Sequence, residues 1–345
     1  MLNQMRGIVI AGGFGTRLRP LTLSRPKPLM PLVNAPLLEY QLGYLKQAGI
    51  TEVCFATNFM ADAVEAEFGN GSRFGMSLTY AVEKEPLDTA GAIRNGYDAI
   101  SGDDCVVFNG DTIHGFDIGA IVRQHNDRNA HVTLTLKRVE RPHPYGVVPL
   151  NAEGRVQGFL EPSEEQKRKL SDEASGWDAI NAGLYVMSKE AIETIPLKRC
   201  NVEREVFPKL IEEGWSVFGD VQDAYWVDIG RPSQYLEATR AVVFGEVGAA
   251  RQLCLSGEAH IEPGAVTEGC ELKGGVSIGS GVKIGKGTTL DNSVILSGAV
   301  IGENCHIARS IISEHCKIGA NTTIRDTALA EGSQIPAYSV LGSIA

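Results

Sequence analysis

Residues 7–20 read GIVIAGGFGTRLRP, and they decide the fold of the first part of the chain. The apolar run at its start ends in glycines, as a buried strand of a parallel sheet does. Similar strand patterns follow at 53–57, 78–82 and 105–109, and helix-spaced patterns at 37–47, 61–68 and 90–100. This alternation predicts βαβ units and a mostly parallel sheet. Residues 131–139 alternate between apolar and polar, which indicates a half-exposed strand, suited to antiparallel pairing, and so a mixed sheet.

The glycine loop that follows the first strand suits a phosphate group. Glycines let the backbone approach a charged ligand, and open α/β sheets bind ligands at the carboxyl ends of their strands. A dinucleotide fingerprint would need glycine where Leu18 stands, and a Walker A loop would need Gly-Lys-Ser/Thr. Arg17 follows the glycines directly, and Lys27 stands between two prolines that restrict its backbone. The loop therefore predicts a phosphate site of a different kind.

Composition narrows the class of protein. The chain has 345 residues, 43% of them hydrophobic and 21% charged, which is ordinary for a globular protein of two domains. A net charge of -10 argues against a nucleic-acid partner, and no apolar stretch is long enough to span a membrane. The seven cysteines include no CxxC pair, so we expect reduced thiols and a cytoplasmic location.

The last hundred residues follow a six-residue period. Gly or Ala follows many of its aliphatic residues, as the tight corner of a triangular prism requires, whereas a meander of short strands would show period two. The expected inward residues are Val266, Leu272, Ile278, Ile284, Leu290, Leu296, Ile301, Ile307, Ile312, Ile318 and Ile324. We therefore predict a left-handed parallel β-helix of hexapeptide repeats at 246–345, with about four to five coils, after a catalytic domain at 1–245.

Two aspartates are candidates for a metal site. Asp111 ends the motif Asn109-Gly110-Asp111 after a buried strand, where an aspartate is equally common as a turn residue. Asp228 lies between apolar neighbours, and a buried carboxylate needs a cation or hydrogen-bond donors.

Together these motifs resemble the sugar-phosphate nucleotidyltransferase family. Residues 13–22 match its signature G-x-G-T-R-L-x-P-x-T, and P-K-P follows at 26–28. The segments 109–111 and 226–230 match the family's N-G-D and W-x-D-x-G motifs. The resemblance implies a Rossmann-like α/β catalytic domain in which Arg17 neutralises phosphate charge, Lys27 holds the α-phosphate, and Asp111 and Asp228 bind Mg²⁺. It also implies that the triphosphate is covered by Ala11, Gly12, Gly13, Gly15 and Thr16.

Further motifs correspond to the family's base-binding and sugar-binding segments. Residues 86–91 read PLDTAG where the family usually has P-L-G-T-A-G, which implies nucleotide binding by Asp88, Thr89, Ala90 and Gly91. Asp88 stands where the family usually has a glycine. Its carboxylate could crowd the base, or it could accept hydrogen bonds from N1–H and N2–H of guanine. The implied sugar-phosphate residues are Gly146, Glu161, Asn181 and Glu203. In the family, a lysine usually follows the residue that corresponds to Glu161. This chain lacks that lysine, and Lys167 or Lys169 could substitute for it.

Within this family, the chain is most similar to mannose-1-phosphate guanylyltransferases. The resemblance implies nucleotidyl transfer from an NTP, with GTP favoured, to mannose 1-phosphate or a related hexose or heptose 1-phosphate. Three alternatives stay open: a thymidylyl-, uridylyl- or adenylyltransferase acting on glucose 1-phosphate, a non-catalytic regulatory paralogue, and a β-helix that transfers acyl groups with His306 or His315. We expect a homo-oligomer assembled through the β-helix. A chain cut after about residue 245 is expected to form a smaller assembly and to keep nucleotide binding.

Overall fold

The computed structural model describes residues 5–100, 102–141, 143, 145–160, 176–248 and 251–342. These residues form two compact units, which are described separately below. The first unit contains residues 1–13 and 41–226, and the second contains residues 14–40 and 227–345. The glycine loop is thus shared, since it continues from Gly13 of the first unit into Phe14 of the second.

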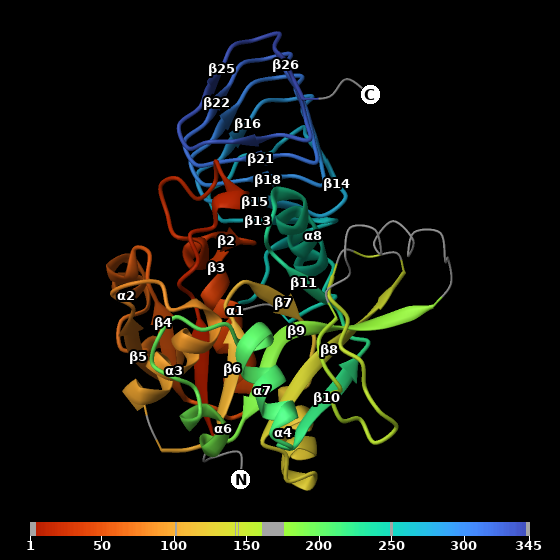
Figure 1. Cartoon of the computed structure of the whole chain (residues 1–345). Helices are drawn as coiled ribbons and strands as arrows, with labels where there is room; N and C mark the ends of the chain where they lie inside the picture. The colour runs from red at the N-terminus through yellow and green to blue at the C-terminus, as the bar shows by residue number, and fades with distance from the viewer. Residues whose placement is uncertain are drawn as a thin grey trace. The chain divides into compact units, whose positions relative to one another are not determined.

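A seven-stranded mixed sheet is the centre of the first unit, in the order β10-β8-β9-β6-β1-β4-β5 (Figure 1). Its strands are β1 (Arg6–Ile10), β4 (Glu52–Thr57), β5 (Ser77–Val82), β6 (Cys105–Asn109), β8 (Val132–Glu140), β9 (Trp177–Met187) and β10 (Val217–Gln222). β1 pairs in parallel with β4 and β6, whereas β9 runs antiparallel to both of its neighbours. The predicted mixed α/β sheet is therefore confirmed.

Helices connect and cover these strands. They are α1 (Leu37–Gln47), α2 (Ala61–Phe68), α3 (Asp88–Ile100), α4 (Ile118–Asp127), α6 (Lys189–Glu193) and α7 (Phe207–Glu212), and β7 (Thr112–His114) follows β6. The carboxyl ends of β1, β5 and β6 lead into residues 11–13, 83–91 and 109–111. The candidate loops of the first unit therefore leave parallel strands at their carboxyl ends, where such sheets bind ligands.

The first half of β8 differs from the half-exposed strand that its alternating pattern predicts. Thr133 and Thr135 are fully buried, as are the apolar residues between and beside them. The hydroxyl of Thr133 lies 3.0 Å from Nδ1 of His125 in α4. The prediction is wrong here because a helix covers the polar side of the strand, and a sequence pattern cannot show that cover.

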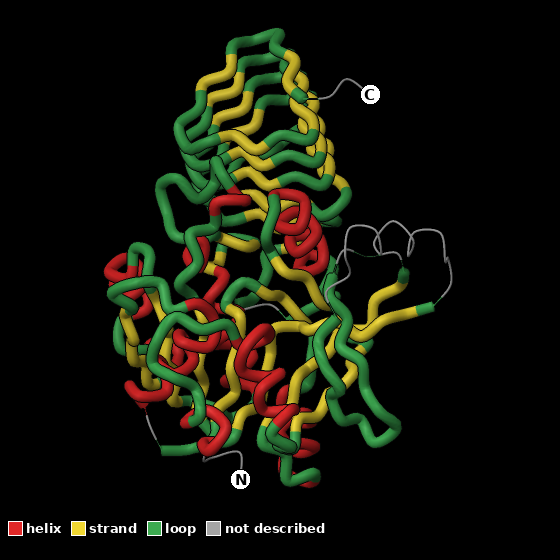
Figure 2. The backbone as a smooth tube through the Cα atoms, in the orientation of Figure 1, coloured by secondary structure: helices red, strands yellow, loops and turns green. Residues whose placement is uncertain are grey.

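The second unit contains a parallel β-helix, whose strands form the stacked ladders of Figure 2. The strands are β12 (Leu255–Ser256), β13 (Ala259–Ile261), β14 (Glu271–Lys273), β15 (Val276–Ile278), β16 (Lys283–Ile284), β17 (Thr289–Asp291), β18 (Val294–Ile295), β19 (Val300–Ile301), β20 (His306–Ala308), β21 (Ile311–Ile312), β22 (Lys317–Ile318), β23 (Thr323–Arg325), β24 (Ala328–Leu329), β25 (Gln334–Ile335) and β26 (Val340–Leu341). The unit also contains β2 (Pro31–Leu32), β3 (Ala35–Pro36) and α8 (Pro232–Val243), and β11 (Trp226–Asp228) enters it.

One coil of the β-helix takes 17 residues, the spacing from Ile278 to its partner Ile295 and from there to Ile312. Two predicted inward residues are therefore wrong. Val266 is 52% exposed, and Ile295, rather than the neighbouring Leu296, lies in the core cluster of the prism. The first five-residue step therefore runs from Leu290 to Ile295, one strand earlier than predicted, whereas the next one, from Ile307 to Ile312, lies where the sequence period placed it. A side-chain carbon on Gly285 would stand 2.5 Å from the backbone nitrogen of Glu303 in the next coil, which explains the small residue there.

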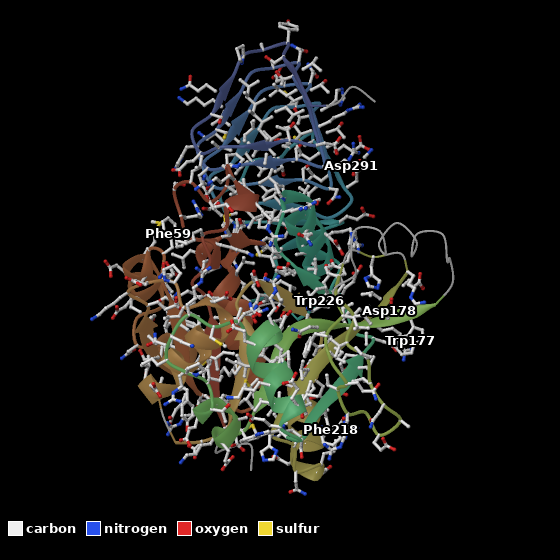
Figure 3. All side chains as sticks on the ribbon, viewed as in Figure 1. Phe59, Trp177, Asp178, Phe218, Trp226 and Asp291 are labelled. Carbon is white, nitrogen blue, oxygen red and sulfur yellow. The ribbon has the colours of Figure 1, made fainter. Side chains whose placement is uncertain are left out.

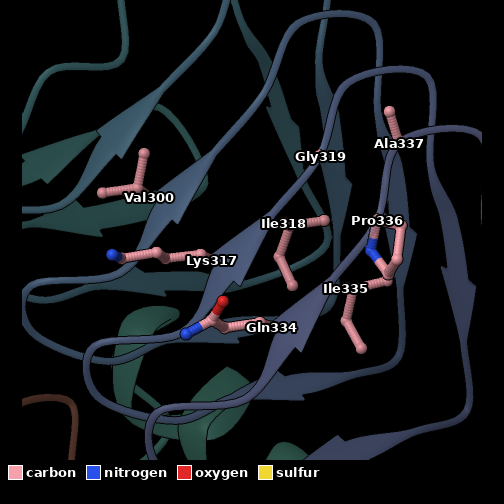
Figure 4. A pocket seen from close by; sticks show the side chains of 8 residues that line it. All are labelled: Val300, Lys317, Ile318, Gly319, Gln334, Ile335, Pro336 and Ala337. Atoms are coloured by element: carbon pink, nitrogen blue, oxygen red, sulfur yellow. The ribbon is translucent and has the colours of Figure 1, made fainter.

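A shallow groove crosses the outer face of this β-helix and is the pocket of Figure 4. Val300, Lys317 and Gln334 lie along it on consecutive strands β19, β22 and β25. The residues that line it include no carboxylate.

Candidate functional site

In the first unit, a buried carboxylate links the glycine loop to the PLDTAG loop. A side-chain carbon on Gly12 would stand 3.8 Å from Oε1 of Glu83, whose Oε2 accepts a hydrogen bond from the amide of Leu87 over 3.0 Å. Burial raises the pKa of Glu83, the amide of Leu87 opposes this rise, and the charge of Asp88 adds to it. Sequence reasoning missed Glu83, although an acidic residue just after a parallel strand was a signal that could have found it.

Asp88 begins α3, where its carboxylate has partners within the protein. Its Oδ1 accepts hydrogen bonds from the amide of Thr89 over 2.7 Å and from Nδ2 of Asn201 over 3.0 Å. Its backbone has a φ of 58°, a conformation that favours glycine, which accounts for the glycine that the family usually has here. The structure thus gives Asp88 a role in holding the loop, whereas its contact with the base stays a prediction.

The rest of the predicted base loop is tied to residues 200–202. The amides of Ala90 and Gly91 donate to the carbonyl of Cys200 over 2.9 and 3.3 Å, and the hydroxyl of Thr89 accepts from the amide of Val202 over 2.9 Å. Ala90 and Gly91 are buried. These two residues therefore shape the loop through its backbone.

Asn181 and Glu203, both predicted to bind the sugar phosphate, are hydrogen-bonded to each other. Nδ2 of Asn181 donates over 2.7 Å both to Oε1 of Glu203 and to the hydroxyl of Tyr185, and its Oδ1 accepts from the amide of Gly183 over 3.0 Å. Burial and the nearby charge of Glu203 raise the pKa of Tyr185, so that hydroxyl stays neutral. A side chain on Gly183, whose φ is 72°, would collide with the amide of Asn109. The N-G-D and N-A-G motifs are therefore in contact.

Trp226, labelled in Figure 3, contacts both Tyr145 and the segment that carries Asn181. Its indole N–H donates to the carbonyl of Ala182 over 2.9 Å, and its ring makes an edge-to-face contact with Tyr145 at 5.8 Å between centroids. Gly146, the next residue, is exposed. Tyr145 and Gly146 thus lie near the segment that carries Asn181.

A charged cluster that sequence reasoning missed includes residues just before Tyr145 in the chain and contacts the amide of Tyr145. Arg141 binds the carboxylate of Asp178 through two nitrogens, and this pairing, helped by His143, holds the pKa of Asp178 below its usual range. Nδ1 of His143 accepts from the amide of Tyr145 over 3.3 Å, so Nε2 carries the proton and donates to Asp178 over 3.0 Å. Asp178 is labelled in Figure 3.

The predicted metal ligand Asp111 lies at the end of β6 in the first unit. The amide of Gly110 donates to the carbonyl of Ile10 over 2.9 Å, which holds the turn beside the end of β1. Asp111 itself is half-buried. Ala11 continues the β1–β4 ladder, since its amide donates to the carbonyl of Ala56 over 2.8 Å.

In the second unit, Arg17 lies against the segment that carries Asp228. A side-chain carbon on Gly230 would stand 3.1 Å from Nη2 of Arg17, so the guanidinium group packs against this glycine. The amide of Gly230 donates to the carbonyl of Asp228 over 2.9 Å and lies 3.1 Å from Oε1 of Gln234, which fixes the turn. Arg17 is exposed and Asp228 is half-buried.

Lys27 packs against the other end of the glycine loop. It is only 7% exposed, and its Cβ lies 3.1 Å from where a side chain on Gly15 would begin. The hydroxyl of Thr22 donates to the carbonyl of Gly15 over 2.8 Å. Thr16 is exposed at the start of a short 3-10 helix over Thr16–Leu18, which leads into the buried Leu18. The second unit therefore brings together both predicted phosphate-binding cations and one predicted metal ligand.

Comparison with known proteins decides the family. Residues 6–243 match the nucleotidyl transferase family, and residues 255–343 match the GMPPB C-terminal domain. The chain belongs to the nucleotidyl transferase family. A mannose-1-phosphate guanylyltransferase of Mycobacterium tuberculosis is 39% identical to it over 310 residues, which are 89% of this chain and 84% of that protein. One of Arabidopsis thaliana is 31% identical over 327 residues, covering 91% and 88%.

A solved structure is similar to this chain in fold. HddC from Yersinia pseudotuberculosis, crystallised in complex with GMP-PN, is 26% identical, with a TM-score of 0.58 over 68% of this chain and 97% of its own. In the described part of this nucleotidyl transferase, no helix is long and apolar enough to cross a membrane.

The residues present in this nucleotidyl transferase fit Mg²⁺. Mg²⁺ usually takes one or two protein carboxylates and completes its shell with phosphate oxygens and water, and Asp111 and Asp228 are two half-buried carboxylates. Among the described residues no three His, Cys, Asp or Glu side chains form a group able to enclose a metal by themselves. Each aspartate, taken by itself, is thus the kind of carboxylate ligand that Mg²⁺ accepts.

One predicted sugar-phosphate residue, Glu161, lies outside the described residues, as do Lys167 and Lys169. All seven cysteines are described, and each is a free thiol.

Proposed function

We propose that this nucleotidyl transferase moves the guanylyl group of GTP to mannose 1-phosphate, giving GDP-mannose and pyrophosphate. The observation that carries the proposal is the packing of Arg17 against Gly230, two residues from Asp228, with Lys27 buried beside Gly15. This arrangement places positive charge near Asp228, the carboxylate that we assign to the metal, as transfer between phosphates requires. The choice of guanine and mannose rests on the names of the relatives.

The chemistry proposed is a direct displacement. A phosphate oxygen of the sugar 1-phosphate attacks the α-phosphorus of the nucleotide, and the bond to pyrophosphate breaks. The attacking oxygen is already ionised at neutral pH, so the protein needs no general base. Lys27 holds the α-phosphate and Arg17 neutralises charge on the pyrophosphate that leaves. Asp111 and Asp228 would hold Mg²⁺, which neutralises phosphate charge when bound.

The glycine loop and the base loop bind the nucleotide in this proposal. Residues 11–16 cover the triphosphate, and the loop at 86–91 holds the base. Glu83 supports both loops, because it lies beside Gly12 and accepts from the amide of Leu87. Since Oδ1 of Asp88 already accepts two hydrogen bonds from the protein, we assign most of the base contact to the loop backbone.

The sugar phosphate binds to the group around Asn181 and Glu203. Nδ2 of Asn181 orients the carboxylate of Glu203, and we assign this carboxylate to the sugar hydroxyls. Gly146 lets the sugar approach the backbone of its loop, and Glu161 completes the proposed set.

A non-catalytic, regulatory paralogue is the alternative that a specific observation favours, namely the absence of the usual lysine after Glu161. The presence of Arg17, Lys27, Asp111 and Asp228 supports an enzyme, because each supplies charge that the reaction needs and that mere binding of a nucleotide sugar does not. We further propose that the protein is a cytoplasmic homo-oligomer assembled through its β-helix.

The proposal is tested with purified protein, Mg²⁺, four nucleoside triphosphates and several sugar 1-phosphates, with pyrophosphate release as the signal. GTP with mannose 1-phosphate should give the highest kcat/KM. A clear preference for dTTP, UTP or ATP would show that the assignment of guanine is wrong. A preference for glucose 1-phosphate would show that the assignment of mannose is wrong.

A further inference from the structure

An ion pair joins the phosphate-binding segment to the β-helix within the second unit. Nη2 of Arg25 lies 2.7 Å from Oε1 of Glu314, and the two side chains are 26% and 14% exposed. Arg25 stands two residues before Lys27, and Glu314 follows strand β21 at a corner of the prism. Partial burial reduces solvent screening, so this pair is a stronger connection than an ordinary surface ion pair.

A second connection lies on the other side of Lys27 in the sequence. Val33 and Asn34 form the turn between β2 and β3, both with positive φ, and Nδ2 of Asn34 donates to the carbonyl of Ile278 over 3.2 Å. Ile278 ends strand β15, which is close to this small hairpin in Figure 1. Since Ile278 pairs with Ile295 and Ile295 with Ile312, the hairpin and Arg25 contact the β-helix two coils apart.

Tyr235 of α8 completes this junction. Its hydroxyl donates to the carbonyl of Pro31 at the start of β2. Burial raises the pKa of Tyr235, and the nearby charge of Glu314 adds to this rise while Arg25 opposes it. The phenol is therefore close to both members of the ion pair and remains a neutral donor.

The chain between these two connections is stiff. Pro26 and Pro28 restrict the backbone on either side of Lys27, and Lys27–Leu29 form a 3-10 helix in which the amides of Leu29 and Met30 donate to Pro26 and Lys27 over 3.0 Å. Few backbone torsions in this segment can adjust. A displacement of Arg25 would therefore also move Lys27. Because Lys27 packs against Gly15, the glycine loop would move as well.

We propose that the β-helix positions the phosphate-binding lysine, with Arg25 and Glu314 as positioning residues and Asn34 as the second attachment. This inference rests on the proposed function, because it assigns Lys27 to the α-phosphate. It gives the C-terminal domain a role in catalysis in addition to assembly. Neither Arg25 nor Glu314 contacts substrate in this scheme, so their effect passes through the placement of Lys27.

The test is a charge exchange in the full chain: Arg25→Glu, Glu314→Arg and the double variant. Each single variant should lower kcat by about tenfold to a hundredfold, since small misplacements of a catalytic group have effects of that size. The double variant should recover most of the loss. Glu331→Gln is the matched control, because Glu331 is exposed at the equivalent corner one coil of 17 residues further on, and it should leave kcat unchanged.

Amide hydrogen exchange of residues 24–36 gives a readout that does not depend on activity. Exchange should be faster in each single variant and return toward wild type in the double variant. Glu314→Gln, which keeps the shape of the side chain, serves if a charge reversal prevents folding. Wild-type kcat and exchange in both single variants, or loss without recovery in the double variant, would overturn the proposal. A wild-type protein without turnover would refute the proposed function instead, and the exchange experiment would still test the connection.

Discussion

The carboxylate of Glu203 accepts a hydrogen bond of 2.7 Å from Asn181, 22 residues earlier in the chain. This bond joins two motifs that are each weak signals in the sequence, and it orients the acid that we propose as a ligand of the sugar.

The first prediction concerns this acid. Glu203→Gln should raise KM for mannose 1-phosphate by about tenfold to a hundredfold, because a hydrogen bond to a charged acceptor contributes about 1.5–3 kcal/mol. KM for GTP should change little. Glu212→Gln, exposed on α7, is the control. Equal changes in both KM values would show that Glu203 supports the fold of the site rather than the sugar.

The second prediction concerns the metal ligands. Asp111→Asn and Asp228→Asn should each lower turnover by at least about two orders of magnitude, since each removes a charged ligand. A titration with Mg²⁺ should show a higher requirement for the metal in both variants. Asp62→Asn, exposed in the first turn of α2, is the control. Wild-type turnover at limiting Mg²⁺ would remove that aspartate from the metal site.

The third prediction separates two roles of Arg17. Arg17→Ala should lower kcat by about 10²–10³-fold with a small change in KM for GTP. The reason is that the guanidinium group stabilises negative charge that develops on the phosphates in the transition state. Arg19→Ala, two residues further along the same exposed turn, should have a much smaller effect. If Arg17→Ala raised KM alone, Arg17 would bind the ground state of the nucleotide.

The fourth prediction concerns Asp88. Replacement by glycine removes a carboxylate that accepts a hydrogen bond from Asn201, at a cost of about 1 kcal/mol, and relieves a left-handed backbone that costs about the same. Loss of the contact with the amide of Thr89 adds little, because glycine is itself well tolerated at the start of a helix. The melting temperature of Asp88→Gly should therefore stay within a few degrees of wild type, and the preference for GTP over ATP and dTTP should persist. A variant that loses this preference would show that Asp88 reads guanine.

A fifth prediction reverses an expectation drawn from the sequence. Residues 14–40 share a compact unit with the β-helix, so removing residues 246–345 would remove the partners of Arg25 and Asn34. We now expect the shortened protein to bind GTP more weakly than the full chain, as well as to form a smaller assembly. Calorimetric titration with GTP and light scattering measure the two effects. Unchanged affinity for GTP would support the simpler division near residue 245.

Local patterns predicted most of the elements correctly. The helices at 37–47 and 61–68 and the strand at 105–109 have the predicted bounds, because their apolar spacing and glycine stops are local properties. The burial of Thr133 and the exposure of Val266 were predicted wrongly, because each depends on whether another element covers that side chain.

The candidate site was predictable only as a set of motifs. Recognition of those motifs supplied Arg17, Lys27, Asp111 and Asp228, but contacts such as that of Asn109 with Gly183 depend on strand order, which the sequence does not display. Glu83 and the ion pair of Arg25 with Glu314 were missed because each links segments of the folded chain, and neither matches a motif.

The central claim is catalysis by this chain, and one experiment tests it most directly. Full-length protein is incubated with Mg²⁺, GTP and mannose 1-phosphate, both products are quantified by mass spectrometry, and binding of GTP is measured in parallel by calorimetry. We predict GDP-mannose and pyrophosphate in equal amounts over many turnovers, with neither formed when mannose 1-phosphate is omitted. Tight binding of GTP or GDP-mannose without release of pyrophosphate would contradict the claim and identify the protein as a regulatory paralogue.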